Sequence, residues 1–239
     1  MTPGPPCRLT CPHCGRHKHI MSIASGNTFG GTIWSDSKRD YPMLPQPSLI
    51  QYCPHCGHYF FYEDGKAKTL PSDQNKPHLF WRKEAKKDEQ SQIDHQWKMV
   101  REETLTNHFG ELSFEQIDAA YDELSSDSLS DERLNQLLFL WLFIFNDVYG
   151  GRSRVESVPV LSPALVQKHE EVLHKLINLN EGNALFVAEM YRELGNYQKC
   201  IELTTALIEA NEDGAVVAKQ FLQRAKMEDA KVFPLVFEE

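Results

Sequence analysis

Two copies of one pentapeptide carry the residues of this chain that are best suited to chemistry. They read Cys11-Pro-His-Cys14-Gly and Cys53-Pro-His-Cys56-Gly, and 38 residues separate Cys14 from Cys53. Cysteines with two residues between them can both reach one metal ion from a tight turn, and two such pairs supply the four thiolate ligands of a tetrahedral zinc ion. The sequence therefore predicts a structural zinc site at Cys11, Cys14, Cys53 and Cys56.

The residues that flank each cysteine pair favour the same chemistry. Pro12 and Pro54 fix the backbone φ angle of the turn, and a glycine follows each pair at Gly15 and Gly57. Glycine readily adopts a positive φ, which lets backbone N–H groups point toward the thiolate sulfurs. We call each pentapeptide a knuckle. Four thiolates leave no coordination position for water, so the pattern favours structural over catalytic zinc.

Other side chains near the knuckles are alternative ligands. Cys7 is a fifth thiol, but no knuckle glycine accompanies it. The histidines that lie inside or beside the knuckles, and that would serve in a mixed site, are His13, His17, His19, His55 and His58. Because four cysteines already complete a tetrahedral shell, we expect these histidines to be solvated or packed against the site.

The tetrapeptide Cys-Pro-His-Cys also permits redox chemistry. It occurs at the active site of some thiol-disulfide oxidoreductases, where it lowers the pKa of the thiol. In those enzymes the first cysteine opens a helix after a strand, whereas here glycine follows each pair and no βαβ pattern surrounds either. The duplication favours a shared metal over redox chemistry. Iron in place of zinc is a further alternative, which a coloured protein would reveal.

The elements expected before residue 70 are short strands. Strand-like residues occupy 19–25, 32–35, 48–52 and 58–62. A polar, proline-rich loop is expected over 36–47, and the cluster Ser35-Asp36-Ser37-Lys38-Arg39-Asp40 is interpreted as an exposed loop, with ligand contact as the alternative. Twin knuckles on short strands resemble a zinc ribbon, and this resemblance implies a β-rich module over 1–70.

Helices are expected after a polar linker over 71–91. Apolar residues recur at helical spacing from Ile93 to Ala225, and Ser130 is an expected N-cap. The most apolar run, 137–145, is interpreted as a buried helix, because a membrane-spanning helix needs about 20 apolar residues. The sequence thus predicts an α+β protein in which an all-α domain spans 92–235.

The most regular part of this helical domain covers 181–214. Ala188 and Tyr191 share one apolar stripe, Gly195 begins a turn, and Cys200 lies in the next stripe. These residues resemble a tetratricopeptide repeat (TPR), with cysteine at position 200 where the family usually has alanine. The resemblance implies a helical surface that binds a protein or peptide partner, and it implies no catalytic function.

The charge of the chain is unevenly distributed. Residues 1–90 contain 12 Lys/Arg and 8 Asp/Glu, whereas residues 91–239 contain 13 Lys/Arg and 26 Asp/Glu. The acidic half repels phosphates and is unsuited to nucleic acid. The N-terminus has neither the basic nor the apolar region of a secretory signal. We therefore expect a cytoplasmic protein without a membrane partner, in a compartment where thiols stay reduced.

These features lead to a hypothesis of a zinc-binding adaptor protein that is not an enzyme, because no common catalytic motif is present. The layout also loosely resembles bacterial zinc-ribbon proteins with no assigned activity. The alternative is a nucleic-acid-binding ribbon, in which Trp34 or Phe60 stacks on a base. Its candidate phosphate contacts are Arg8, Arg16, Lys18, Lys38 and Arg39. A thiol-disulfide oxidoreductase is the third hypothesis.

Overall fold

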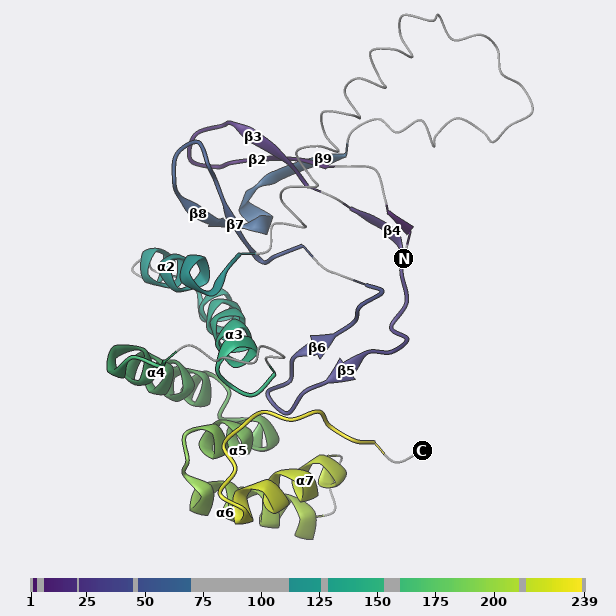
Figure 1. The fold of residues 1–239 in the computed structure, drawn as a ribbon, viewed down its shortest axis with the longest axis vertical. Coiled ribbons are helices and arrows are strands. Elements are labelled where there is room, and N and C mark those ends of the chain that lie inside the picture. Colours follow the sequence, from purple (N-terminus) through teal and green to yellow (C-terminus); the bar gives the residue numbers. More distant parts are fainter. Residues whose placement is uncertain are drawn as a thin grey trace, which may run out of the picture. The chain divides into compact units, whose positions relative to one another are not determined.

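The computed structural model describes residues 2–3, 7–20, 22–44, 47–69, 112–125, 129–152, 160–210 and 214–237. The chain divides into two compact units, whose elements are labelled in Figure 1. Unit 1 comprises residues 1–30 and 41–113, and unit 2 comprises residues 31–40 and 114–239. The expected linker over 71–91 and the expected helix that begins at Ile93 lie outside the described residues.

Unit 1 is built from short antiparallel strands. Strand β2 is the centre of a three-stranded sheet with the order β3-β2-β9, β7 pairs with β8, and β1 pairs with β4. A single 3-10 turn, η1 (Tyr62–Asp64), separates β8 from β9. The strands are β1 (Thr2–Pro3), β2 (Cys7–Thr10), β3 (His17–Ile20), β4 (Ile23–Ser25), β7 (Ile50–Tyr52), β8 (Tyr59–Phe61) and β9 (Lys66–Thr69).

Each knuckle connects two neighbouring antiparallel strands of unit 1. Strand β2 ends directly before Cys11 and β3 follows that knuckle, while β7 ends directly before Cys53 and β8 follows the second knuckle after Gly57 and His58. The small core beneath them consists of Leu9, Ile20 and Phe60, which pack with the first cysteine of each knuckle. The first cysteine of each knuckle is therefore part of the hydrophobic core of unit 1.

Unit 2 contains the helices. Among the described residues they are α2 (Phe114–Leu124), α3 (Asp131–Val148), α4 (Pro163–Leu179), α5 (Ala184–Glu193), α6 (Tyr197–Glu209) and α7 (Ala215–Lys226). Short antiparallel strands near the N-terminus and helices toward the C-terminus confirm the predicted α+β class. The helix expected at 137–145 is the buried part of α3, and Ser130 caps α3 by accepting a hydrogen bond from the Arg133 backbone N–H.

Successive helices of unit 2 pack against one another in chain order (Figure 1). Helices α5 and α6 are joined at Gly195, whose φ of 72° is a conformation that favours glycine. The buried residues Ala188, Cys200 and Phe221 bring α5, α6 and α7 into one hydrophobic cluster. The stripes predicted from helical periodicity are confirmed, since small residues lie where these helices press together.

Strands β5 (Thr32–Ile33) and β6 (Arg39–Asp40) form a hairpin that belongs to unit 2, although its sequence lies between the two knuckles. The backbone N–H of Ser35 donates to the carbonyl of Phe233, and Leu235 donates to the carbonyl of Ile33. The C-terminal segment therefore lies alongside β5, and Trp34 forms an isolated bridge with Pro234. The yellow C-terminal segment can be followed in Figure 1.

The interpretation of residues 35–40 as an exposed loop is wrong for Ser35 and Asp36, which are buried, whereas Ser37 and Arg39 are exposed. Asp36 is 0% exposed and accepts hydrogen bonds from Asn146 at 2.9 Å and from Arg152 at 2.9 Å. Lys38 donates to Asp147, the residue after Asn146 on α3. Sequence polarity suggested solvent, but these polar groups are partners of buried groups on and after α3. The hairpin is therefore anchored to the helices by charge.

No helix among the described residues is both long enough and apolar enough to cross a membrane.

Candidate metal centre

The two knuckles have the same backbone geometry. In the first, the N–H of Gly15 donates to the carbonyl of Cys11 at 3.0 Å, and in the second the N–H of Gly57 donates to the carbonyl of Cys53 at 2.9 Å. The φ angles of the two glycines are 71° and 77°, so the predicted positive φ is confirmed at both. Any other residue at either position would be strained, because residues with a β-carbon rarely adopt a positive φ.

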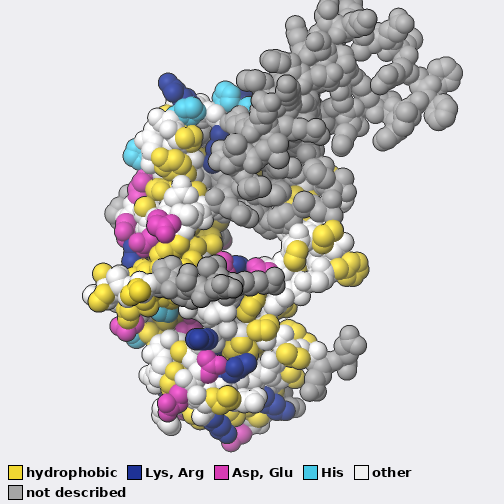
Figure 2. All heavy atoms as spheres, in the orientation of Figure 1, with side chains coloured by type: hydrophobic (Ala, Val, Ile, Leu, Met, Phe, Trp, Pro, Cys, Tyr) yellow, Lys and Arg dark blue, Asp and Glu magenta, His cyan; other side chains and the backbone are white. Residues whose placement is uncertain are grey.

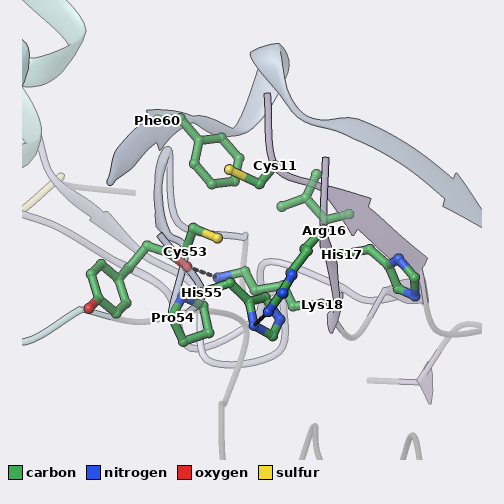
Figure 3. Close-up of a pocket in the computed structure, with 10 residues that line it drawn as sticks. Cys11, Arg16, His17, Lys18, Cys53, Pro54, His55 and Phe60 are labelled. Carbon is green, nitrogen blue, oxygen red and sulfur yellow. Dashed lines mark hydrogen bonds between the residues drawn. The ribbon is translucent and has the colours of Figure 1, made fainter. Parts of the chain in front are cut away.

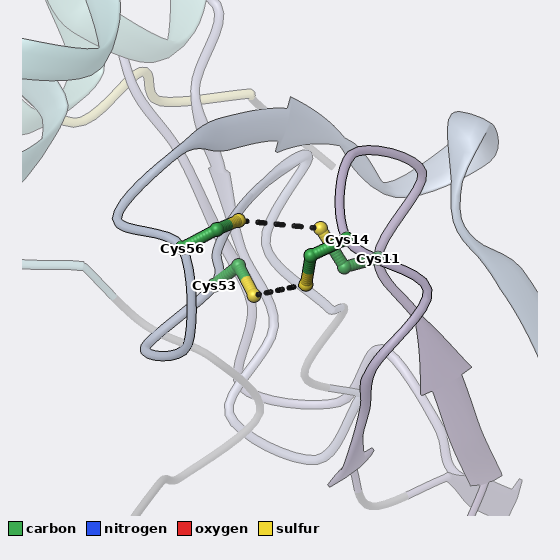
Figure 4. A group of neighbouring side chains, drawn as sticks. All are labelled: Cys11, Cys14, Cys53 and Cys56. Carbon is green, nitrogen blue, oxygen red and sulfur yellow. Dashed lines mark hydrogen bonds between the residues drawn. The ribbon is translucent and has the colours of Figure 1, made fainter.

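The two knuckles present their four sulfur atoms to one another (Figure 4). The Sγ atoms of Cys11 and Cys56 are 3.8 Å apart, those of Cys14 and Cys53 are 3.7 Å apart, and all four lie within 4.8 Å of one another. Metal–sulfur bonds of about 2.3 Å in a tetrahedron place neighbouring sulfurs about 3.8 Å apart. The described geometry therefore suits a four-coordinate ion at the centre of the cluster.

Neither close sulfur pair is a disulfide, because a disulfide requires a separation of about 2.0 Å. Both close pairs also join different knuckles: Cys11 meets Cys56, and Cys14 meets Cys53. A redox motif would pair the two cysteines of one tetrapeptide. The arrangement brings the sulfurs of both knuckles together around one point.

Backbone amides and burial have opposite effects on the pKa values of the thiols. Burial raises the pKa of Cys53, but backbone amides of Cys56 and His55, together with the thiols of Cys56 and Cys11, lower it to about 7. The amide of His58 lowers the pKa of Cys56, yet burial and the three neighbouring thiols raise it to about 12. Without a cation, the cluster thus favours one thiolate and disfavours others. A divalent metal ion supplies the charge that four thiolates need.

Basic and aromatic side chains line a small hollow beside Cys11 and Cys53 (Figure 3). Lys18 donates from Nζ to the carbonyl of Tyr52 at 3.0 Å, which ties β3 to the end of β7. Arg16 lies 3.4 Å from Nδ1 of His55 and so connects the two knuckles. The hollow that these residues line has room for roughly one water molecule and not for an organic substrate.

The other predicted ligand candidates lie outside the four-sulfur cluster. Cys7 is on β2, where it faces Ile20 of β3. The rings of His13 and His58 stack on each other at 4.9 Å, and those of His17 and His19 meet edge to face at 6.0 Å. This arrangement agrees with the expectation that these histidines are solvated or packed against the site.

Three of the side chains expected to contact nucleic acid make other contacts in the structure. Lys38 and Trp34 belong to unit 2, where Lys38 pairs with Asp147 and the indole N–H of Trp34 donates to Asp40. Phe60 is 3% exposed and packs beneath the cysteines, so it cannot stack on a base. These residues are engaged in structure, and a nucleic-acid surface on unit 1 needs other side chains.

The sequence analysis did not identify Lys66 and Lys68 as exposed basic residues of a strand, although their spacing indicates one. They alternate with Ala67 after Asp64-Gly65, and both are exposed on β9. An alternation of period two is typical of a strand with one polar face. The strand was missed because it is only four residues long and its partner, β2, lies far earlier in the sequence.

No protein-family model matches the chain, and no similar curated protein or solved structure was found.

Proposed function

We propose that this chain is a zinc-binding adaptor protein in which the metal is structural. The observation that carries the proposal is the convergence of Cys11, Cys14, Cys53 and Cys56 from two knuckles with matching backbone geometry. Sulfur-only sites of tetrahedral shape select zinc or iron, and four thiolates leave no position for a reacting water. The metal would clamp the two strand pairs of unit 1 and perform no chemistry.

The site supports a role without catalysis. Each Cys-Pro-His-Cys sequence occupies a turn between two strands, and neither opens a helix. The nearby hollow has no room for a substrate larger than water. The sixth cysteine, Cys200, is fully buried in α6, and burial raises its pKa to about 12, so it is not a reactive thiol. A redox enzyme would need an accessible thiolate beside a site for its substrate.

The helical unit is the proposed binding surface for a protein or peptide. Buried residues of α5, α6 and α7 pack in one hydrophobic cluster, which supports the proposal of a TPR-like arrangement drawn from the sequence resemblance over 181–214. The side chain of Gln220 on α7 hydrogen-bonds both the N–H and the carbonyl of Val236. It thereby holds the C-terminal segment along α7 and leaves Val216, Val236 and Phe237 more than half exposed. These three exposed apolar side chains, on α7 and on the C-terminal segment held along it, favour a protein partner.

The metal proposal is tested by elemental analysis of protein purified without added metal, together with titration of accessible thiols. We expect about one zinc ion per chain, and four thiols that react only after chelation. A protein without bound metal, whose cysteine pairs cycle readily between thiol and disulfide and reduce insulin, would instead support the redox hypothesis. A coloured protein with bound iron would support the four-cysteine site but would show that its metal is iron and not zinc.

The adaptor proposal needs a separate test. Proteins captured by the wild-type chain are compared quantitatively with those captured by a Val216→Ser, Phe237→Ser variant. We expect specific partners to be lost from this variant. The matched control is Phe29→Ser, which removes an apolar side chain that is 81% exposed on unit 1. Partners that disappear only with the control would place the binding surface on unit 1 and refute the assignment to unit 2.

A further inference from the structure

The outer face of the β3-β2-β9 sheet carries a concentration of positive charge. Residues directly opposite each other in antiparallel strands share a face, and the register places Arg8 between His19 and Lys68, and Thr10 between His17 and Lys66. The six side chains of this face are Arg8, Thr10, His17, His19, Lys66 and Lys68. None of the six is acidic, whereas the opposite face carries the buried Leu9 and Ile20.

Two basic residues stand opposite each other on this face. Arg8 stands directly opposite Lys68, and like charges in opposed positions of a sheet are destabilising. Lys66 and Lys68 are both exposed, and among the described residues no ion pair involves Arg8, Lys66 or Lys68. An anion that bridges the two strands would relieve the repulsion. Figure 2 shows Lys, Arg and His side chains gathered over the region where Figure 1 places β2 and β3.

The shape of the face selects an extended anion. Rows of side chains along a strand repeat every ~6.7 Å, and neighbouring strands lie ~4.8 Å apart, so the cationic groups form a flat grid and not a cup. A flat grid can follow a chain of phosphates but cannot enclose a small metabolite. The edge-to-face rings of His17 and His19 lie on the same face and are a surface on which bases can stack.

We propose that this sheet face binds the phosphate backbone of a single-stranded nucleic acid. Arg8, Lys66 and Lys68 contact phosphates, and His17 and His19 offer their rings to the bases. Glu63 and Asp64 of η1, directly before β9, mark the end of the binding face because they would repel phosphates. This function goes beyond the adaptor role, uses unit 1 alone, and involves neither the apolar surface of unit 2 nor catalysis.

The test is fluorescence anisotropy with a labelled 20-nucleotide single strand of mixed sequence, titrated with zinc-loaded full-length protein at several salt concentrations. Three phosphate contacts predict a slope of roughly −2 in log K against log salt, because each contact to a single strand contributes about −0.7. Raising the salt from 50 to 200 mM should then weaken binding roughly 15- to 20-fold. Absence of binding at the lowest salt would overturn the proposal.

The decisive variant replaces Arg8, Lys66 and Lys68 with glutamine. We expect at least a tenfold loss of affinity and a salt slope near zero. The matched control replaces three exposed lysines of unit 2 with glutamine, and so changes the net charge by the same amount. These lysines are Lys219, Lys226 and Lys231. Control protein should bind like wild type. Equal losses in both variants would mean that only net charge matters and would overturn the site.

Further measurements identify the anion and guard against a folding defect. Zinc content and circular dichroism should be the same in wild type and the triple variant, and His17→Phe, His19→Phe offers a second variant that keeps two rings on the face. That variant should retain most of the affinity, and a tenfold loss would overturn the stacking role. Tighter binding of a duplex, of poly-glutamate, of anionic vesicles or of a second copy of the chain would overturn the assignment to single strands.

Discussion

At the scale of single residues, the four-thiol site makes a sharp distinction among the six cysteines. Replacing Cys11, Cys14, Cys53 or Cys56 with serine removes one of the four converging sulfurs and should lower the zinc content well below one ion per chain under mild chelation. Cys7→Ser and Cys200→Ser serve as controls and should leave the content unchanged, since neither belongs to the cluster. Zinc loss in the Cys7→Ser protein would show that the fifth thiol is a ligand.

A second prediction at this scale concerns His169 and the pH dependence of stability. Its ring stacks on Phe145 at 4.0 Å and on Trp141 at 6.0 Å, and burial lowers its pKa from 6.5 to about 4. Between these values the unfolded chain binds a proton that the folded protein cannot accept, so stability is lost as pH falls. A shift of this size corresponds to a loss on the order of 3 kcal/mol between pH 7 and pH 4.

The measurement is urea unfolding at pH 7, 5.5 and 4, followed by the helical circular dichroism signal. His169→Phe retains an aromatic ring without a titrating group, so its free energy of unfolding should fall less over this range. Burial also raises the pKa of Glu193, but that group is present in both proteins and its contribution cancels in the comparison. Parallel pH dependences in the two proteins would contradict the assignment to His169.

Residue types and spacing predicted the cysteine cluster because its geometry is local. Each knuckle brings its two sulfurs together within five residues, and only the meeting of the two knuckles depends on the fold. The role of Asp36 was not predictable in this way. Its partners, Asn146 and Arg152, lie 110 and 116 residues further along the chain. A polar residue in a proline-rich segment resembles solvent-exposed sequence unless its distant partners are known.

At the scale of elements, one buried ion pair contributes to the anchoring of the β5–β6 hairpin. The side chains of Arg152 and Asp36 are 3% and 0% exposed, and their N–O distance is 2.9 Å. Arg152→Met should destabilise unit 2 by about 3–5 kcal/mol, because it leaves a buried carboxylate without its cation. Chemical denaturation followed by helical circular dichroism measures the loss.

A double-mutant cycle separates the ion pair from simple packing. Adding Asp36→Asn to Arg152→Met removes the orphaned charge but keeps the shape and the acceptor for Asn146, so part of the stability should return. The single change Lys38→Met is the comparison for a partly exposed contact, since Lys38 is 20% exposed in its pair with Asp147. A cost for Lys38→Met equal to that for Arg152→Met would mean that burial does not set the strength of the anchor.

Element types followed from sequence where periodicity was long. Helix α3 has 18 residues and α4 has 17, which is several turns of a consistent apolar stripe. The strands have two to four residues, too few for alternation to show, and β9 was therefore missed. Assignment of the hairpin to unit 2 could not be predicted at all, because residues 31–40 have neighbours on both sides that belong to unit 1.

At the scale of the whole molecule, the two units are stabilised by different means. Unit 2 has an extensive apolar core, with residues such as Leu138, Trp141 and Leu173 fully buried. Unit 1 has a small core that includes two of the proposed metal ligands. Thiolate–zinc sites contribute an apparent ~10–16 kcal/mol at neutral pH, which exceeds the net stability of many small domains. Metal removal should therefore unfold unit 1 and spare unit 2.

Hydrogen exchange with and without a chelator tests this difference at each element. Amides of β2, β3, β7 and β8 should lose protection when the metal is removed, whereas those of α5 to α7 should keep it. The hairpin is the critical segment, since its sequence lies between the knuckles but its hydrogen bonds are to unit 2. We expect Ser35 and Leu235 amides to remain protected with the helices. Their loss together with β2 would show that docking of the hairpin depends on the closed metal site, because an open loop raises the entropic cost of holding it in place.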